Sequence, residues 1–173
     1  MREGSKFLQL DPPKDIYEAI NSLLIFYKNV PSVTNYPVYL GNIDELLEPF
    51  MDDVDEAQAK KLFKLFFTHI DRTVLDSFSH ADIGPKATRA GRLILEVERE
   101  LLDAVPNITM KYDTDITPDD FGIECVKTAL KTAKPSFANH KMFKKELGEN
   151  YVIASCYNGL LLGGGSYTLC RLI

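Results

Sequence analysis

The chain has 173 residues and a formal net charge of −5, and this length suits one domain with a substantial core. Acidic and basic residues are spread along the sequence without a basic block, which argues against nucleic acid as a partner. No apolar run reaches the length of a membrane span. The sequence has three cysteines, an odd number, and they are widely spaced. We therefore expect a cytoplasmic protein that has no disulfide framework and no membrane partner.

The first 105 residues read mainly as helices. A helix is predicted after Asp11-Pro12-Pro13, where apolar residues recur at helical spacing, and it should end before Pro31. "PVYLG" (37–41) is β-rich and ends on glycine, so it predicts a short strand. Further helices are predicted at 42–50, at about 55–74, with a Phe-rich core stripe, and at about 85–104.

After residue 105 the pattern changes to short β-type runs that alternate with helices. The predicted strands are 107–113, 135–139, 151–155 and 166–173, and the predicted helices are 117–132 and 140–148. This alternation is typical of right-handed parallel units in an α/β sheet. We therefore predict a single domain over residues 1–173, mainly helical over 1–105 and βαβαβ over 106–173.

Cys156 stands at the end of the predicted strand 151–155, where reacting groups of α/β sheets gather. Its position alone leaves open a catalytic thiol and a buried structural one. The glycines that follow in "LGGGS" lack dinucleotide-binding spacing, and they form either a connector or a loop against a substrate. Cys125 and Cys170 lie inside a predicted helix and a predicted strand, so we read both as core residues.

The three histidines show no metal-ligand spacing, so we predict no metal site. His80 and Asp82 are expected at a loop in "SFSHADIGP", as satisfied structural polar groups that could form a hydrogen-bonded pair. His69 is expected to be partly buried on an aromatic-rich helix. A cysteine hydrolase stays open as an alternative, and it requires that one of the three histidines lies within hydrogen-bond reach of Cys156.

Four segments appear in a recognisable order: "LLDAVPNITMKYD", "TPDDF", "PSFANHKMF" and "YVIASCYNGL". This order resembles the central part of the glycyl radical enzymes, the family that includes pyruvate formate-lyase and the diol and choline lyases. The segments "SVTNYPVYLGNIDELLEPF" and "SCYNGLLLGGG" are most similar to the uncharacterised YjjI-type branch of that family. The resemblance extends from about residue 35 to the end of the sequence.

The resemblance implies a ten-stranded α/β barrel in which Cys156 is the catalytic cysteine. Its thiyl radical, formed by giving a hydrogen atom to a stored glycyl radical, would abstract a hydrogen atom from an unknown small substrate. Ser155, Tyr157, Asn158 and Gly164 are the expected substrate-binding residues. The resemblance implies no cofactor bound directly to this chain. A separate iron–sulfur enzyme that uses S-adenosylmethionine would install the glycyl radical, and the remaining part of the enzyme is the other implied partner. A homodimer is a further possible assembly, and it does not follow from the resemblance.

Three departures from the family pattern shape the expected function. Asn158 stands where many eliminating members carry a glutamate that acts as a general base. Asparagine cannot accept a proton at neutral pH, although it can orient a substrate by hydrogen bonding. Ser155 replaces the first cysteine of the pair used in pyruvate formate-lyase. The Arg-Val-x-Gly-type glycyl loop does not occur in the sequence. We therefore expect a fragment without radical chemistry by itself. The alternative is a non-catalytic α/β module that binds a partner or dimerises through an uncovered sheet edge.

Overall fold

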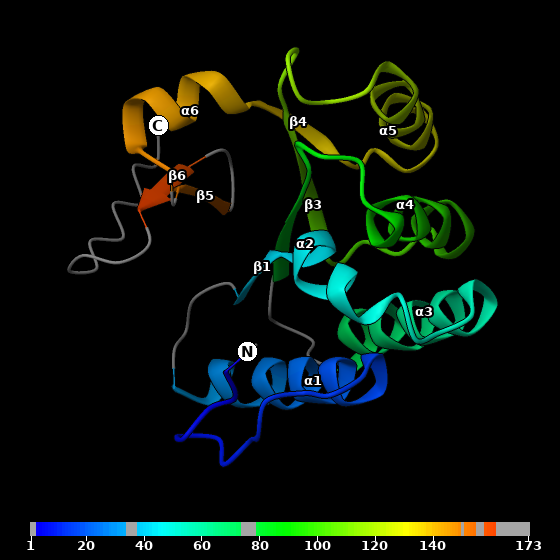
Figure 1. Ribbon diagram of the computed structural model, residues 1–173, viewed down its shortest axis with the longest axis vertical. Coiled ribbons are helices and arrows are strands. Elements are labelled where there is room, and N and C mark those ends of the chain that lie inside the picture. Colours follow the sequence, from blue (N-terminus) through cyan, green and yellow to red (C-terminus); the bar gives the residue numbers. More distant parts are fainter. Residues whose placement is uncertain (1–2, 34–37, 74–78, 150, 155–157, 162–173) are drawn as a thin grey trace.

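The computed structural model describes residues 3–33, 38–73, 79–149, 151–154 and 158–161 (Figure 1). Its helices are α1 (Ile16–Val33), α2 (Ile43–Leu47), α3 (Glu56–Thr73), α4 (Arg89–Leu101), α5 (Asp119–Thr132) and α6 (His140–Leu147), with a 3-10 turn η1 (Glu48–Phe50) after α2. Its strands are β1 (Val38–Asn42), β2 (Ser79–Ile83), β3 (Asn107–Tyr112), β4 (Ser136–Asn139), β5 (Tyr151–Ala154) and β6 (Asn158–Leu161). None of the helices in these ranges is both long and apolar enough to cross a membrane.

The strands β1 to β4 form one parallel sheet in which their spatial order follows the sequence. Each connection between neighbouring strands contains a helix, and the right-handed crossing rule places these helices on one face of the sheet. Figure 1 shows α3, α4 and α5 on that face, while the hairpin of β5 and β6 lies on the opposite side of the sheet. The predicted α/β class with parallel strands is confirmed for this sheet.

Strand β3 shows how the sheet is divided into two faces. Ile108 and Met110 belong to the core shared with the helices, and Thr109 and Lys111 alternate with them. The register of the neighbouring strands extends this alternation across the sheet. The face away from α4 and α5, which we call the inner face, is formed by Tyr39, His80, Asp82, Thr109 and Lys111.

The hydrophobic core lies between the other face of the sheet and the helices. Phe63, Phe66 and Phe67 of α3 are fully buried in it, which confirms the Phe-rich stripe as core. A fully buried side chain of this kind contributes roughly 1.5–3 kcal/mol to folding. Cys125 of α5 is also fully buried there, as predicted, and burial raises the pKa of its thiol to about 12. This thiol therefore stays protonated at neutral pH.

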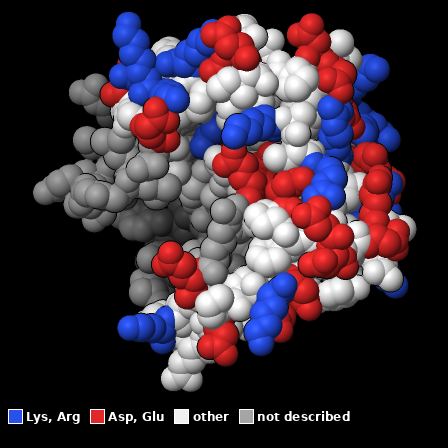
Figure 2. Space-filling view, in the orientation of Figure 1, with Lys and Arg blue, Asp and Glu red and all other residues white. Residues whose placement is uncertain are grey.

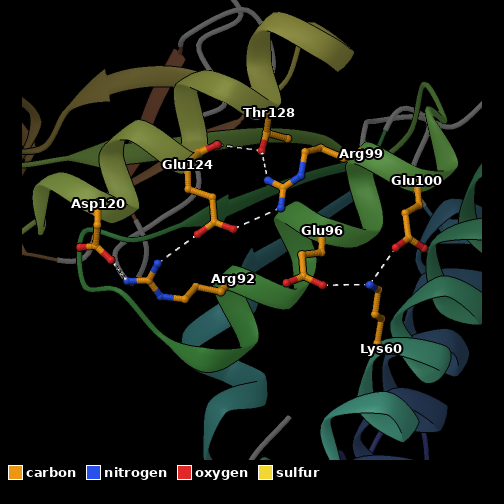
Figure 3. Close-up of polar contacts among 8 residues, drawn as sticks. All are labelled: Lys60, Arg92, Glu96, Arg99, Glu100, Asp120, Glu124 and Thr128. Carbon is orange, nitrogen blue, oxygen red and sulfur yellow. Dashed lines mark hydrogen bonds and ion pairs between the residues drawn. The ribbon is translucent and has the colours of Figure 1, made fainter.

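The outer surfaces of α4 and α5 are joined by a network of charged side chains (Figure 3). Glu124 of α5 bridges two arginines of α4, at 3.0 Å from Arg92 and 3.2 Å from Arg99. Arg92 also reaches Asp120, and Arg99 donates to Thr128. These contacts fix the two helices side by side, on the face of the sheet opposite the inner face.

Two predictions about strands need correction. His80 and Asp82 lie on β2 within the sheet, although the sequence pattern predicted a loop there. The predicted strand at 151–155 is present as β5, but it pairs antiparallel with β6 instead of extending the parallel sheet. The predicted strand at 166–173, with Cys170, lies outside the described residues.

Candidate functional site

A buried ion pair marks the inner face of the sheet. Lys111 Nζ lies 3.1 Å from Asp82 Oδ2, and the two side chains are 4% and 0% exposed. Tyr39 donates its hydroxyl proton to the same Asp82 oxygen at 2.7 Å, and Lys111 donates to Asn42 Oδ1 at 2.7 Å. Since these residues come from β1, β2 and β3, the parallel register of the sheet brings them together. Both members of the ion pair also contact the backbone of β5.

Burial in surroundings of low polarity changes the pKa values of Asp82 and Tyr39. Burial raises the pKa of the Asp82 carboxyl, while Lys111 and the Tyr39 hydroxyl act against the shift by stabilising the charged form. Burial and the neighbouring Asp82 raise the pKa of Tyr39, so its hydroxyl remains a hydrogen-bond donor at neutral pH. Two buried atoms of the inner face, Asp82 Oδ1 and His80 Nε2, have no hydrogen-bond partner in the described part of the chain. Unsatisfied buried polar atoms are uncommon and often mark places where a ligand or another segment binds.

A pocket of about 530 Å³ opens beside this ion pair. It lies at the carboxyl ends of β1, β3 and β4, where α/β sheets commonly place their sites. Its polar lining includes Asn42, Glu45, Lys86, Lys111, His140 and Tyr151. The mixture of amide, carboxylate, ammonium and imidazole groups suits a small polar molecule.

Tyr151 of β5 is held on the wall of this pocket by three contacts. Its hydroxyl lies 2.6 Å from His140 Nδ1, at the start of α6. Its ring stacks on Phe143 with centroids 5.6 Å apart, and Lys111 Nζ lies 4.7 Å from the ring centroid. Burial lowers the pKa of His140, so its ring is neutral at pH 7. These contacts join the start of β5 to both α6 and the sheet.

The sequence of the chain matches a known protein family along its whole length. The family described as "Glycyl radical enzyme YjjI-like" matches residues 1–173. The chain belongs to this YjjI-like glycyl radical enzyme family. The resemblance inferred from its sequence motifs is therefore confirmed.

Two curated relatives of this YjjI-like chain are described as uncharacterised proteins. A protein of Haemophilus influenzae is 50% identical over 172 residues, which cover 99% of this chain and 33% of the relative. The protein YjjI of Escherichia coli is 42% identical over 173 residues, which cover 99% of this chain and 34% of the relative. The YjjI-like chain thus spans about a third of the length of these relatives.

The site residues predicted from the sequence belong to, or follow, the segments that form β5 and β6. Ser155, Cys156 and Tyr157 stand between β5 and β6 in the sequence and lie outside the described residues, as does Gly164. Asn158 is the first residue of β6, where its backbone is paired with Ala154. The structure therefore places β5, the strand before Cys156, beside the inner face, with β6 paired to it, and the role of each predicted residue stays a prediction.

Sequence reasoning did not select Tyr39 or Lys111, and it interpreted Asp82 as a structural polar group beside His80. The three residues belong to different segments, and only the sheet register brings them together. One signal was present in "ITMKY", where Thr109 and Lys111 alternate with the core residues of β3. A lysine at an inward position of a strand covered on both faces needs a buried partner, and that requirement points to a carboxylate on a neighbouring strand.

The remaining histidine and charge predictions concern other surfaces. His69 is half-buried on α3, as predicted, and burial lowers its pKa. In the ranges that the structure describes, no group of three or more His, Cys, Asp or Glu side chains is arranged to hold a metal ion. Lysine and arginine are interspersed with aspartate and glutamate on the face shown in Figure 2. That face offers no extended basic surface for a phosphate backbone.

Proposed function

We propose that this chain is the part of a glycyl radical enzyme that presents the hydrogen-abstracting cysteine, Cys156, to a small substrate. Membership of the YjjI-like family is the observation that carries the proposal. The fold supports it, because the strands before and after Cys156 form a hairpin beside a polar inner face and a pocket. The activity of the whole protein is part of the proposal, since the chain spans about a third of its curated relatives.

The proposed chemistry is a series of hydrogen-atom transfers at sulfur. A stored glycyl radical supplies the oxidising equivalent that removes the hydrogen atom from the Cys156 thiol. The sulfur radical then takes one hydrogen atom from a C–H bond of the substrate, which re-forms the thiol and leaves the unpaired electron on carbon. After rearrangement, the product radical recovers a hydrogen atom from the same thiol. The sulfur radical left behind takes its hydrogen atom back from the glycine, which restores the glycyl radical. The iron–sulfur cluster and S-adenosylmethionine belong to the activating enzyme, a separate partner in this proposal.

The residues of this chain would contribute position and shielding. The inner face and α6 enclose the start of β5, which would limit the access of water to a reactive sulfur at the end of the strand. Asn158 is proposed to orient the substrate by hydrogen bonding, with Ser155, Tyr157 and Gly164 close to it. The unpartnered atoms Asp82 Oδ1 and His80 Nε2 are consistent with a further segment or ligand against the inner face.

We propose that β1 to β4 are four strands of the wall of a ten-stranded barrel. Their order follows the sequence and their helices lie on one face, as the wall of a closed barrel requires. An open doubly wound sheet would instead reverse its strand order and carry helices on both faces. In this proposal residues 1–173 form a partial domain, and the remaining part of the enzyme completes the barrel.

The proposal can be tested without knowledge of the substrate. The full-length protein is activated anaerobically with its activating enzyme, and the glycyl radical is recorded by electron paramagnetic resonance in H₂O and in D₂O. A thiol exchanges its hydrogen with solvent, so reversible transfer between Cys156 and the glycine would replace the glycine α-hydrogen by deuterium. The doublet caused by that hydrogen should then collapse in D₂O.

Two variants make this test specific. Cys156→Ser should keep the radical signal but retain the doublet in D₂O, because its hydroxyl does not take part in the transfer. Cys125→Ser is the matched control, since Cys125 is buried on α5, and it should behave like the wild type. If the doublet collapses equally in the Cys156→Ser variant, Cys156 is not the thiol that communicates with the glycine.

The alternative of an interaction module has one supporting observation. In the described residues β4 is an edge strand of the sheet, and Phe137 on it is 41% exposed. An exposed edge with an apolar side chain can pair with another chain. Failure to form any glycyl radical in the activated full-length protein, together with a dimer in size-exclusion chromatography, would favour this alternative.

A further inference from the structure

We propose that the Asp82–Lys111 ion pair is a clamp that positions the β5–β6 hairpin and, through it, the thiol of Cys156. The inference rests on the proposed function, because it concerns the presentation of the reacting cysteine. Asp82 and Lys111 are positioning residues in this proposal, since they act through the backbone of β5.

The clamp occupies the free edge of β5. Tyr151 and Ile153 are two residues apart in an extended strand, so their backbone groups point to the same edge. Ile153 N–H donates to Asp82 Oδ2 at 3.1 Å, and Lys111 Nζ donates to the Tyr151 carbonyl at 3.3 Å. Thus one donor and one acceptor of β5 are satisfied by two side chains of the sheet, in the way that a neighbouring strand would satisfy them.

The two members of the clamp are held in place by other residues. Tyr39 donates to the Asp82 oxygen that also accepts from Ile153, and Asn42 accepts from Lys111. Residues of three strands therefore fix the position of both charged groups independently of their contacts with β5. Because this arrangement is buried, its hydrogen bonds are directional and poorly replaced by water.

The burial of these charges supports a positional role. Replacing a buried ion pair with apolar residues of similar size often leaves a protein equally stable or more stable. The ion pair is therefore a weak source of stability, but it determines where the β5 backbone can lie. Ile153 precedes Cys156 by three residues, which span at most about 10 Å of chain. A fixed Ile153 consequently restricts the positions that Cys156 can reach.

Side-chain packing also holds β5, so the test must separate the two effects. Phe143 and Leu147 of α6 pack with Tyr151 and Ile153 in a small cluster. Asp82 contacts the backbone of β5, and Lys111 contacts both the backbone and the ring of Tyr151, whereas this cluster acts on side chains. The informative comparison therefore changes only the side-chain acceptor of the Ile153 N–H and keeps the residues of the cluster.

The experiment compares two double variants of the full-length protein that differ only at residue 82. Asp82→Ala/Lys111→Met removes the acceptor for Ile153 N–H, and Asp82→Asn/Lys111→Met keeps a neutral acceptor. Neither variant leaves an unpaired buried charge from this ion pair. Amide hydrogen exchange at Ile153 and alkylation of Cys156 by iodoacetamide, located by peptide mass spectrometry, are measured under anaerobic conditions.

We expect the alanine variant to exchange the Ile153 amide about tenfold or more faster than the wild type, and to change the alkylation rate of Cys156 by a similar factor. The asparagine variant should stay within about twofold of the wild type in both rates, since one acceptor is enough to hold the Ile153 amide. This rescue by a neutral residue is not expected if the ion pair only stabilises the fold.

A second buried ion pair provides the matched control. Lys134 Nζ lies 2.5 Å from Glu98 Oε2, both side chains are buried, and neither contacts β5. Glu98→Gln/Lys134→Met should therefore leave both rates unchanged. Equal rates in the alanine and asparagine variants, or the same acceleration in this control, would overturn the clamp. If the alanine variant does not fold, amide exchange at Ile153 is measured in the Tyr39→Phe variant instead. Exchange faster than in the wild type supports the clamp, and exchange at the wild-type rate overturns it.

These readouts are independent of radical chemistry. If the clamp variants behave as expected but the Cys156→Ser variant shows the wild-type collapse in D₂O, the proposed role of Cys156 fails and the clamp stands. If only the Cys156→Ser result is as expected, the cysteine keeps its role and the clamp fails.

Discussion

At the scale of single residues, two buried aspartates near the carboxyl ends of strands show how partners determine charge. Asp82 is paired with a lysine, whereas the partners of Asp44 are neutral donors: the Gly84 amide at 3.0 Å and the Thr88 hydroxyl at 3.0 Å. Burial raises the pKa of Asp44 to about 7, because no cation compensates for the loss of water around the carboxylate. Asp44 therefore holds a proton over a pH range in which an exposed aspartate is ionised.

This difference predicts how stability depends on pH. Between an unfolded-state pKa of about 3.9 and the folded-state pKa of about 7, the folded protein retains a proton at Asp44 that the unfolded chain has released. The free energy of unfolding should therefore fall as pH rises through this range, by at most about 1.4 kcal/mol per pH unit from this group. Asp44→Asn cannot ionise, so its stability relative to the wild type should increase from pH 5 to pH 7 in urea denaturation of the full-length protein.

Asp120→Asn is the control for this experiment. Hydrogen bonding to Arg92 lowers the pKa of Asp120, so its carboxylate is ionised in both the folded and the unfolded state from pH 5 to pH 7. Its stability difference from the wild type should be constant over that range. A constant difference for Asp44→Asn as well would show that Asp44 is not protonated in the folded protein.

At the scale of helices and strands, two ion pairs that join different elements should differ in strength. Glu124 bridges α5 to α4 at the partly exposed surface of Figure 3, and Glu98 meets Lys134 in a buried position. Glu124→Gln should cost about 0.5–1 kcal/mol of unfolding free energy, and less in high salt, because solvent screens the pair. Glu98→Gln should cost about 3–5 kcal/mol with little salt dependence, since it removes the carboxylate that is ion-paired with the buried Lys134 ammonium.

Urea denaturation of the full-length protein at 0.05 M and 1 M NaCl measures both effects. Lys134 also donates to the Pro106 carbonyl at 3.0 Å, and this contact remains in the Glu98→Gln variant. Similar costs for the two variants at both salt concentrations would contradict the assignment of one pair to solvent and the other to the interior.

The same elements show how far the sequence predicts the fold. Helices α3, α4 and α5 were predictable because each has an apolar stripe at helical spacing that packs on the sheet. Strand β2 was missed because His80 and Asp82 make "SHADI" look like a loop, and the need for a polar residue at Asp82 depends on Lys111 of the next strand. The antiparallel pairing of β5 with β6 was missed because a short strand contains no signal for the direction of its partner.

The candidate site was predictable only in part for the same reason. Cys156 could be selected because a strand ends there and the surrounding motifs resemble a known family. Tyr39, Asp82 and Lys111 are far apart in the sequence, and their contacts depend on the register of three strands. Long-range register is a property of the assembled sheet, so single segments do not reveal it.

At the scale of the whole molecule, the order of the strands predicts whether β4 has a neighbour on its outer side. Strands β1 to β4 follow the sequence order with the helices on one face, and β4 is an edge in the described residues. If the sheet continues into a barrel in the full-length protein, the backbone of β4 has a strand on both sides, as the backbone of β3 does. If β4 remains an edge, the N–H groups that point away from β3 are open to solvent.

Amide hydrogen exchange distinguishes these two arrangements within one protein. Strand β3 is the internal reference, because it pairs with both β2 and β4. A continuing sheet predicts that alternate amides of β4 exchange about as slowly as those of β3, since both kinds of amide then open only with larger unfolding events. If every second amide of β4 exchanges much faster than the amides of β3, the sheet has an open edge at β4. That result would favour pairing of β4 with a second chain.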